Sequence, residues 1–417
     1  MDRRSFLTLV GLAACERRPA PRPAPDAAAR DVTAPDVAAP PEVEEDFPAA
    51  PPPVAPVDAA ALRPLGDATT RLAVALWPAL RDGPGNPLWS PAAVAASLGL
   101  VAAMERPDAA ARAHAFLGLR GDRAEADRAL ATLLRQWSSG FDAPGFAMLQ
   151  RPFVARGARL DDDARARLRG PYAAPAALVS ASANEGIRAR VHQFFRARTR
   201  GAVEHLIALD GIVPEVPANV VSVARAALAV RGTRGAGRFR VGGVAAIDVE
   251  TAVVRAGASV ARATDASVLR VPLADPDKLL DVLVPDEGRR LDAVEPGALA
   301  ALLDHNRAMT PARGAVVLPA LDTVPTEATR LRDALWEAGL SEPFDPERSP
   351  LAMTGAPRAW VSELFHFARA SLTASDPPGG GALGPAAFAV DRPFTWALRD
   401  ARHGALLALG RVFDPRE

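Results

Sequence analysis

Side chains that could perform catalysis or bind a metal are few in this chain, and they form none of the common active-site patterns. The 417 residues include six histidines and one cysteine. They contain no G-x-S-x-G turn, no H-E-x-x-H pair and no G-x-x-x-x-G-K-S/T loop, the motifs of serine hydrolases, zinc proteases and P-loop enzymes. A single cysteine cannot supply a cysteine-based zinc site. We therefore expect no enzyme activity, no cofactor and no metal.

Two histidines and an acidic triplet allow more than one interpretation. His192 and His205 are too far apart for the i, i+4 spacing with which a helix holds a metal, so we interpret each as a helix-end or core residue. Asp161, Asp162 and Asp163 could suggest a calcium site, but they precede a helical pattern, where acidic side chains interact favourably with the helix dipole. We predict a helix start there.

A glycine-rich stretch near the C-terminus could in principle cradle a phosphate. Gly379, Gly380, Gly381 and Gly384 lack an accompanying lysine and a strand-to-helix context, so we interpret the stretch as a flexible loop. The chain also has 49 basic and 49 acidic side chains. This balance gives no electrostatic argument for binding nucleic acid.

The N-terminus carries an export signal that ends at the only cysteine. Arg3 and Arg4 precede an apolar stretch too short to cross a bilayer of about 30 Å, and the pair resembles a twin-arginine signal. Leu12-Ala13-Ala14-Cys15 matches a bacterial lipobox. We predict that residues 1–14 are a cleaved signal peptide and that Cys15 is lipidated. The alternative is that Cys15 is an inert core residue.

Residues 15–58 are rich in proline, alanine and acidic side chains and contain almost no large apolar ones. Such a segment cannot bury enough surface to offset the entropy of ordering, so we predict a disordered tether. From this tether and the predicted lipidation of Cys15, we expect the protein to lie in the cell envelope, outside the cytoplasm. It would contact the membrane only through the lipid on Cys15. Glu16 after the cysteine favours the outer membrane.

Residues 59–417 read as one α+β domain, because no second long linker interrupts them. Apolar residues at three- and four-residue spacing predict helices in the first half. Those helices cover residues 59–80, 91–104, 109–117, 124–137, 161–168 and 185–198. Apolar runs predict strands at 249–254, 268–272, 280–284 and 315–318, followed by a closing hairpin over residues 394–412.

The C-terminal hairpin carries a specific family resemblance. Residues 388–394 read F-A-V-D-R-P-F, and an apolar strand, a turn, L-A-L-G-R-V and Pro415 follow. This order resembles the C-terminal signature of serpins, the serine protease inhibitor superfamily. The resemblance implies a helix-rich N-terminal half packed on large β-sheets, with a C-terminal β-hairpin.

Further segments extend the resemblance over most of residues 65–415. Asn86 to Pro91 is similar to the family's N-x-x-x-S-P entry into a helix, with Ser90 as N-cap and Pro91 as first helical residue. His192 stands where the family prefers asparagine. Residues 361–366 resemble the strand before the reactive-centre loop, and His366 matches that strand's histidine, for which we expect a structural hydrogen-bonding role.

The region that corresponds to the reactive-centre loop is short for the family. It comprises Ala374, Ser375, Asp376, Pro377, Pro378, Gly379, Gly380, Gly381, Ala382, Leu383, Gly384, Pro385, Ala386 and Ala387. Fully extended, it spans under about 50 Å. Pro377 and Pro378 would each remove a donor from a central strand, and the three consecutive glycines raise the entropy cost of ordering. The scissile pair implied by the resemblance is Gly380-Gly381, which offers no side chain to a protease specificity pocket.

We therefore expect a monomeric, lipid-anchored, protein-binding member of the family whose loop is unsuited to covalent trapping of proteases. The partner would be a serine protease or another envelope protein. The alternative is a serine-type endopeptidase inhibitor that acts outside the cytoplasm, supported by the family resemblance alone. An enzyme is the third class considered, and the scattered histidines give it little support.

Overall fold

The computed structural model describes residues 47–48, 59–83, 85–119, 121–138, 140–179, 184–204, 206–207, 218–242, 245–348, 350–356, 358–376 and 386–417. The contacts of the chain separate residues 1–43 from a unit formed by residues 44–417. The predicted signal peptide, Cys15 and most of the predicted tether lie outside the described residues.

Helices dominate the first half of the domain, as the spacing of apolar residues predicts. They are α1 (Ala59–Leu80), α2 (Pro91–Met104), α3 (Pro107–Phe116), α4 (Arg123–Trp137), α5 (Asp162–Arg169) and α6 (Asn184–Arg198). Side-chain caps fix where several of them begin. Ser90 Oγ accepts a hydrogen bond from Ala93 N at 3.0 Å, and Asp161 Oδ1 accepts one from Ala164 N at 2.7 Å. Both predicted helix starts are therefore confirmed.

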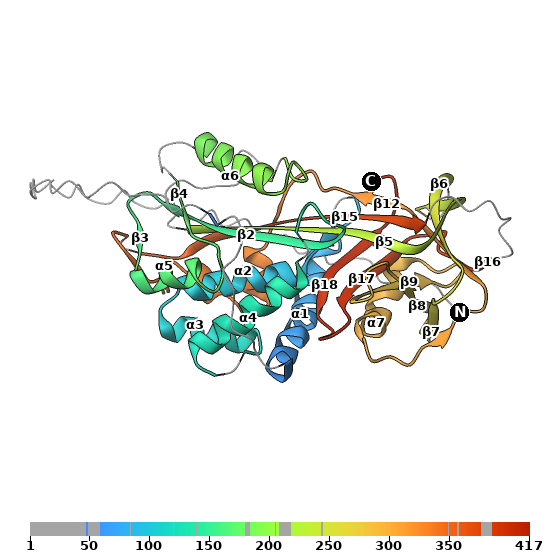
Figure 1. The fold of residues 1–417 in the computed structure, drawn as a ribbon, viewed down its shortest axis with the longest axis horizontal. Helices are drawn as coiled ribbons and strands as arrows, with labels where there is room; N and C mark the ends of the chain where they lie inside the picture. Colours follow the sequence, from blue (N-terminus) through green and yellow to red (C-terminus); the bar gives the residue numbers. More distant parts are fainter. Residues whose placement is uncertain are drawn as a thin grey trace, which may run out of the picture. The chain divides into compact units, whose positions relative to one another are not determined.

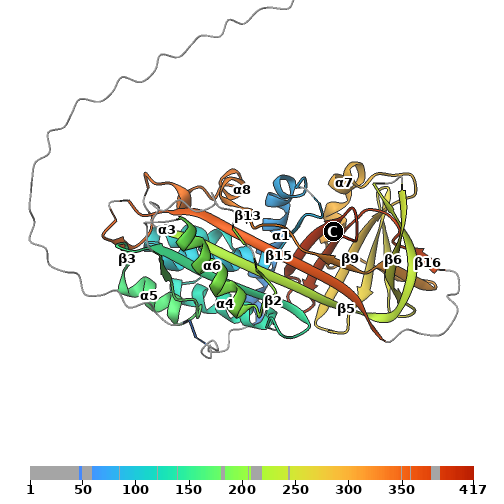
Figure 2. The same cartoon turned by 90° about the horizontal axis from the view of Figure 1, so that it is seen from above.

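A nine-stranded sheet crosses the molecule. Its main path runs in the order β12 (Leu321–Thr323), β15 (Val361–Asp376), β5 (Ala218–Val241), β6 (Ala245–Val254), β11 (Ala315–Pro319) and β16 (Ala386–Ala389). Off this path, β2 (Gly145–Ala155) pairs with β5 and with β4 (Ala177–Val179), and β13 (Thr329–Arg330) pairs with β15. The longest members, β5 and β15, run side by side (Figure 2).

A second sheet contains the predicted hairpin. Its seven strands follow the order β1 (Leu88–Trp89), β18 (Leu406–Val412), β17 (Phe394–Asp400), β9 (Lys278–Pro285), β8 (Ala266–Pro272), β7 (Ser259–Ala263) and β10 (Thr310–Pro311). Helix α7 (Leu291–Leu303) packs against it. The remaining elements are the strand pair β3 (Arg159–Leu160) with β14 (Met353–Thr354), helix α8 (Arg332–Glu337) and a 3₁₀ turn (Glu342–Phe344).

The elements form layers around the nine-stranded sheet. Helix α6 lies across one face, and helices α1, α2 and α4 pack beneath the other (Figure 1). Helix α2 is buried along its whole length, which explains its alanine-rich, uncharged sequence. Most residues of β5 and β15 are buried where the two strands pair, although β15 also carries polar side chains such as Glu363, His366 and Arg369.

The sequence did not predict β2 or the full length of β5. Strand β2 contains Gln150, Arg151 and Pro152, which are unusual in a central strand, but no strand pairs with the outer edge of this stretch of β2 among the described residues. Strand β5 is rich in alanine and glycine, which have low strand propensity. Its glycines serve close packing, since a Cβ on Gly232 would lie 2.5 Å from the backbone oxygen of Val253.

Candidate functional site

The seam between β15 and β5 is the candidate functional site. We use the word seam for the parallel ladder that joins the two strands from Val361 opposite Ala218 to Asp376 opposite Thr233. The ladder is interrupted by irregularities near its two ends, between Val361 and Glu363 and between Ala374 and Asp376. No strand lies between β5 and β15 over this length in the described part of the sheet. A polypeptide could enter the sheet here only by breaking these pairs.

His366 connects the seam to the helical layer. It stands opposite Ser222 in the ladder, and its side chain is 1% exposed. His366 Nε2 accepts a hydrogen bond from the backbone N–H of Ser90 at 2.9 Å, and Nδ1 lies 3.2 Å from Ser222 Oγ. The acceptor at Nε2 requires a proton on Nδ1, so Nδ1–H donates to the serine. The expected structural role of His366 is confirmed.

The surroundings of His366 favour its neutral form. Burial lowers the pKa of His366 to about 3, because a charged imidazolium would lose its hydration in this position. Ser90 Oγ donates to the backbone oxygen of Leu407 at 2.6 Å, and this bond extends the network into β18. One serine therefore links helix α2, the seam and the C-terminal hairpin.

The ends of the seam determine how much chain remains for a loop. Ala374, Ser375 and Asp376 form the end of β15, and Ala386 and Ala387 belong to β16, which pairs with β11. The other residues of the expected loop, from Pro377 to Pro385, lie outside the described residues. Nine residues therefore separate the two strands.

Two solved structures share the fold of this chain over nearly their full length. SRPN18 from Anopheles gambiae matches with a TM-score of 0.71 and 17% identity, covering 86% of this chain and 98% of that one. Tengpin, described as a thermophilic serpin in the native state, matches with a TM-score of 0.71 and 16% identity, covering 88% and 97%. The chain has the serpin fold.

In sequence, the match to the serpin family model lies in the second half of the chain. Residues 233–415 match the family described as serpin (serine protease inhibitor). Probable serpin E3 of Danio rerio is 31% identical over 96 residues, and glia-derived nexin of Mus musculus is 27% identical over 147. These matches cover 23% and 36% of the relatives' lengths and 21% and 33% of this chain.

The remaining residues predicted from the serpin resemblance do not gather at the seam. His192 lies on α6, where its Nε2 accepts hydrogen bonds from the backbone N–H groups of Leu206 and Ile207 at 3.2 and 3.1 Å. These hydrogen bonds give His192 a structural role, but it lies in the middle of α6 and is half-buried, so the predicted helix-end or core position is wrong. His205 lies outside the described residues. Within the described ranges, no three histidine, cysteine or acidic side chains are grouped to hold a metal, and no helix is long and apolar enough to span a bilayer.

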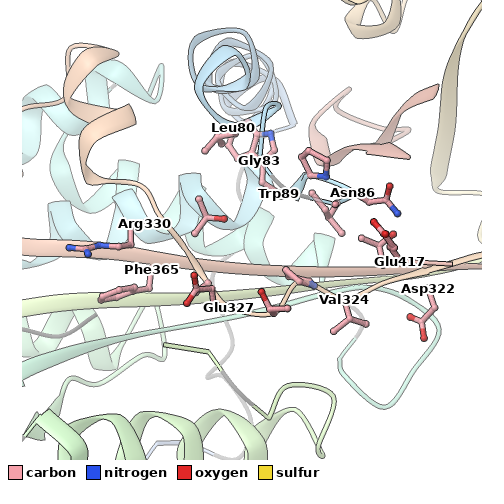
Figure 3. A pocket seen from close by; sticks show the side chains of 18 of the residues that line it. Leu80, Gly83, Asn86, Trp89, Asp322, Val324, Glu327, Arg330, Phe365 and Glu417 are labelled. Atoms are coloured by element: carbon pink, nitrogen blue, oxygen red, sulfur yellow. The ribbon is translucent and has the colours of Figure 1, made fainter. Parts of the chain in front are cut away.

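A cavity of about 830 Å³ lies beside the seam, on the side of β15 away from β5. Residues 322–330, which run from β12 through the connection into β13, form one wall, and Leu80, Trp89 and Glu417 contribute to the others (Figure 3). Two of its lining charges have partners: Arg330 Nε lies 3.0 Å from Glu363 Oε2, and Asp322 Oδ1 lies 3.2 Å from Arg369 Nη2.

The N-terminal segment contributes a contact that the sequence did not predict. Phe47 packs edge-on against Phe194 of α6 with ring centroids 5.0 Å apart, and the guanidinium carbon of Arg151 on β2 lies 5.4 Å from the Phe47 ring. Arg198 donates to the backbone oxygens of Phe47 and Pro48 at 2.6 and 3.2 Å. Phe47 thus contacts both the helix over the sheet and the strand beneath it. The one sequence feature that could have indicated this contact is that Phe47 is the only aromatic residue in the proline- and alanine-rich segment 15–58.

Proposed function

We propose that this serpin-fold protein is a lipid-anchored envelope protein that binds a partner protein without trapping a protease covalently. The observation that carries the proposal is the length of chain left beside a closed seam. β15 has 16 residues, which corresponds to about 50 Å of strand. Only Pro377, Pro378, Gly379 and Gly380 separate its end from the scissile bond between Gly380 and Gly381 that the family resemblance implies.

Those four residues would extend about 13 Å, which is roughly a quarter of the seam. An inserted strand of this length would replace few of the pairs that must break. Its two prolines cannot donate to a ladder, and its glycines lose more conformational freedom on ordering than other residues. These properties support a loop that stays outside the sheet, and hence a protein that acts by binding.

A serine protease inhibitor is the second candidate. The description of the matched family supports it, as does the seam, where two parallel strands lie adjacent with no strand between them. On this alternative, cleavage after Gly380 would be followed by opening of the seam and uptake of the freed chain.

One experiment separates the two candidates. The full chain is incubated with trypsin-, chymotrypsin- and subtilisin-type proteases, and the products are resolved in SDS. We expect intact or nicked protein and no complex that survives SDS. A complex that survives SDS would overturn the proposal in favour of inhibition. For each protease, a serpin that is known to trap it serves as the positive control.

The lipid anchor is tested separately. We expect the wild-type protein to partition into the detergent phase of Triton X-114 and to incorporate labelled palmitate, because diacylation adds enough buried methylene groups for stable membrane attachment. The Cys15→Ala variant should remain in the aqueous phase. Equal partitioning of the two proteins would exclude lipidation at Cys15 and leave the binding proposal untouched.

A further inference from the structure

A second cavity, which we call the β2 groove, lies at the outer edge of strand β2. Its volume is about 570 Å³, within the range of roughly 300–1,000 Å³ that small-molecule sites occupy. The end of α4, residues 171–174, the end of α6 and the segment at residues 47–48 surround it. Its apolar lining comes from Leu100, Leu134, Met148, Leu149 and Phe47.

Two residues that line the β2 groove each carry a buried N–H group without an acceptor. Arg135 Nη2 donates to the backbone oxygen of Pro171 at 2.7 Å, but the buried Nη1 has no hydrogen-bond partner among the described residues. Gln150 is 9% exposed, and its Nε2 is likewise buried with no partner in the described part of the chain. Buried donors that lack an acceptor are costly, and such groups normally require a partner.

The charge of the groove favours an anion. Its lining includes Arg135, Arg198 and Arg200 but one acidic side chain, Asp142. Asp142 is committed to Arg200, since its Oδ2 lies 3.1 Å from Arg200 Nη2. Arg135 therefore has no neutralising carboxylate in the lining, and burial lowers its pKa.

We propose that the β2 groove binds an organic carboxylate that carries an apolar tail. The Arg135 and Gln150 side chains turn toward the groove, so that Nη1 and Nε2 donate to the two carboxylate oxygens, and the tail packs against Leu134 and Met148. A carboxylate suits this pair because it presents two acceptor oxygens and no donor. A phosphate monoester would bring three acceptor oxygens to two unmet donors, and a neutral alcohol would leave the guanidinium charge unbalanced. This site is independent of the proposed partner-binding function.

Titration calorimetry of the full chain with octanoate tests the proposal, with octanol and octyl phosphate as matched ligands. We expect saturable binding of one octanoate and at least tenfold weaker binding of octanol. No saturable octanoate binding, or equal affinity for the alcohol, would overturn the assignment. Tighter binding of octyl phosphate would overturn the choice of headgroup.

Variants locate the site. Arg135→Leu and Gln150→Leu should each weaken octanoate binding at least tenfold and leave the octanol affinity unchanged. Arg128→Leu, on an exposed position of the same helix, is the control and should bind octanoate as the wild type does. If Arg135→Leu fails to fold, Gln150→Leu decides the outcome, because it replaces a neutral side chain by one of similar size. Unchanged octanoate affinity in a folded Gln150→Leu protein would place the ligand elsewhere.

Discussion

The Nε2 atom of His366 accepts a hydrogen bond from the backbone N–H of Ser90 at 2.9 Å, although the two residues lie 276 positions apart in the chain. This bond joins the N-cap residue of α2 to a residue within the seam. It also sets a requirement, because the accepting nitrogen must stay unprotonated. Any separation of β15 from β5 has to break this contact or move α2 with it.

The protein should lose stability in acid through His366. Its pKa is about 3 in the folded state and about 6.5 when unfolded, so the unfolded chain binds the proton first. The stability it contributes is present above pH 6.5 and declines as the pH falls toward 3. Between pH 7.5 and pH 5, His366 should lower the free energy of unfolding by about 2 kcal/mol. Urea unfolding of the wild type and of His366→Gln at both pH values measures this difference. The free energy of unfolding of the variant should change less between the two pH values, because the variant lacks the histidine.

Glu105 should have the opposite effect. Burial first, and then repulsion by Glu342, raises the pKa of Glu105 to about 7, and its Oε2 atom is buried without a hydrogen-bond partner in the described residues. The folded state therefore holds the proton more tightly, and the cost of the charged form grows as the pH rises from 4.5 to 7. As the pH rises from 5 to 8, the free energy of unfolding of Glu105→Gln should increase by about 2 kcal/mol relative to that of the wild type.

The same unfolding titrations test Glu105. The difference in the free energy of unfolding between variant and wild type is compared at the two pH values, so that other groups cancel. Glu342→Gln is the companion variant, because removing that charge should lower the pKa of Glu105 and reduce the pH dependence. A difference that does not change with pH would contradict the raised pKa.

The helical half and the closing hairpin could be predicted from sequence because their signals are local. Ser90 followed by Pro91 marks a helix start within two residues, and the cap forms as expected. The two apolar runs of the hairpin pair with each other, β17 with β18, across a short turn. In each case the residues that determine the element lie within that element or beside it.

The seam could be predicted only in part, because its two strands are distant in sequence. The strand at residues 361–366 was visible, but its pairing with β5 depends on residues over a hundred positions away. Ser222 gives no local sign that it will face His366. The β2 groove was not visible either, since Arg135 and Gln150 come from a helix and a strand whose approach only the tertiary fold determines.

Removing the Phe47 side chain should loosen α6. Phe47 contacts the rings or guanidinium groups of Phe194, Arg151 and Arg198, and one such aromatic or cation–π contact contributes about 1 kcal/mol. Phe47→Ala should destabilise the protein by about 1–2 kcal/mol. Hydrogen exchange should accelerate in residues 188–198 more than in the seam. Phe47→Tyr retains the ring and should match wild type; uniform exchange in all three proteins would show that the contact does not restrain the helix.

A disulfide across the seam tests whether the sheet ever opens. Ala224 and Ala368 are paired in the ladder and both are buried, so Ala224→Cys with Ala368→Cys, in a Cys15→Ala background, places two thiols on adjacent strands. If the loop stays outside the sheet, cleavage within residues 377–385 should leave the melting temperature unchanged in both the oxidised and the reduced protein. Insertion would instead add a ladder of hydrogen bonds and raise the melting temperature of the reduced protein only. That asymmetry, measured by calorimetry before and after limited proteolysis, would show that the seam accepts a strand, which is the step that the inhibitor interpretation requires.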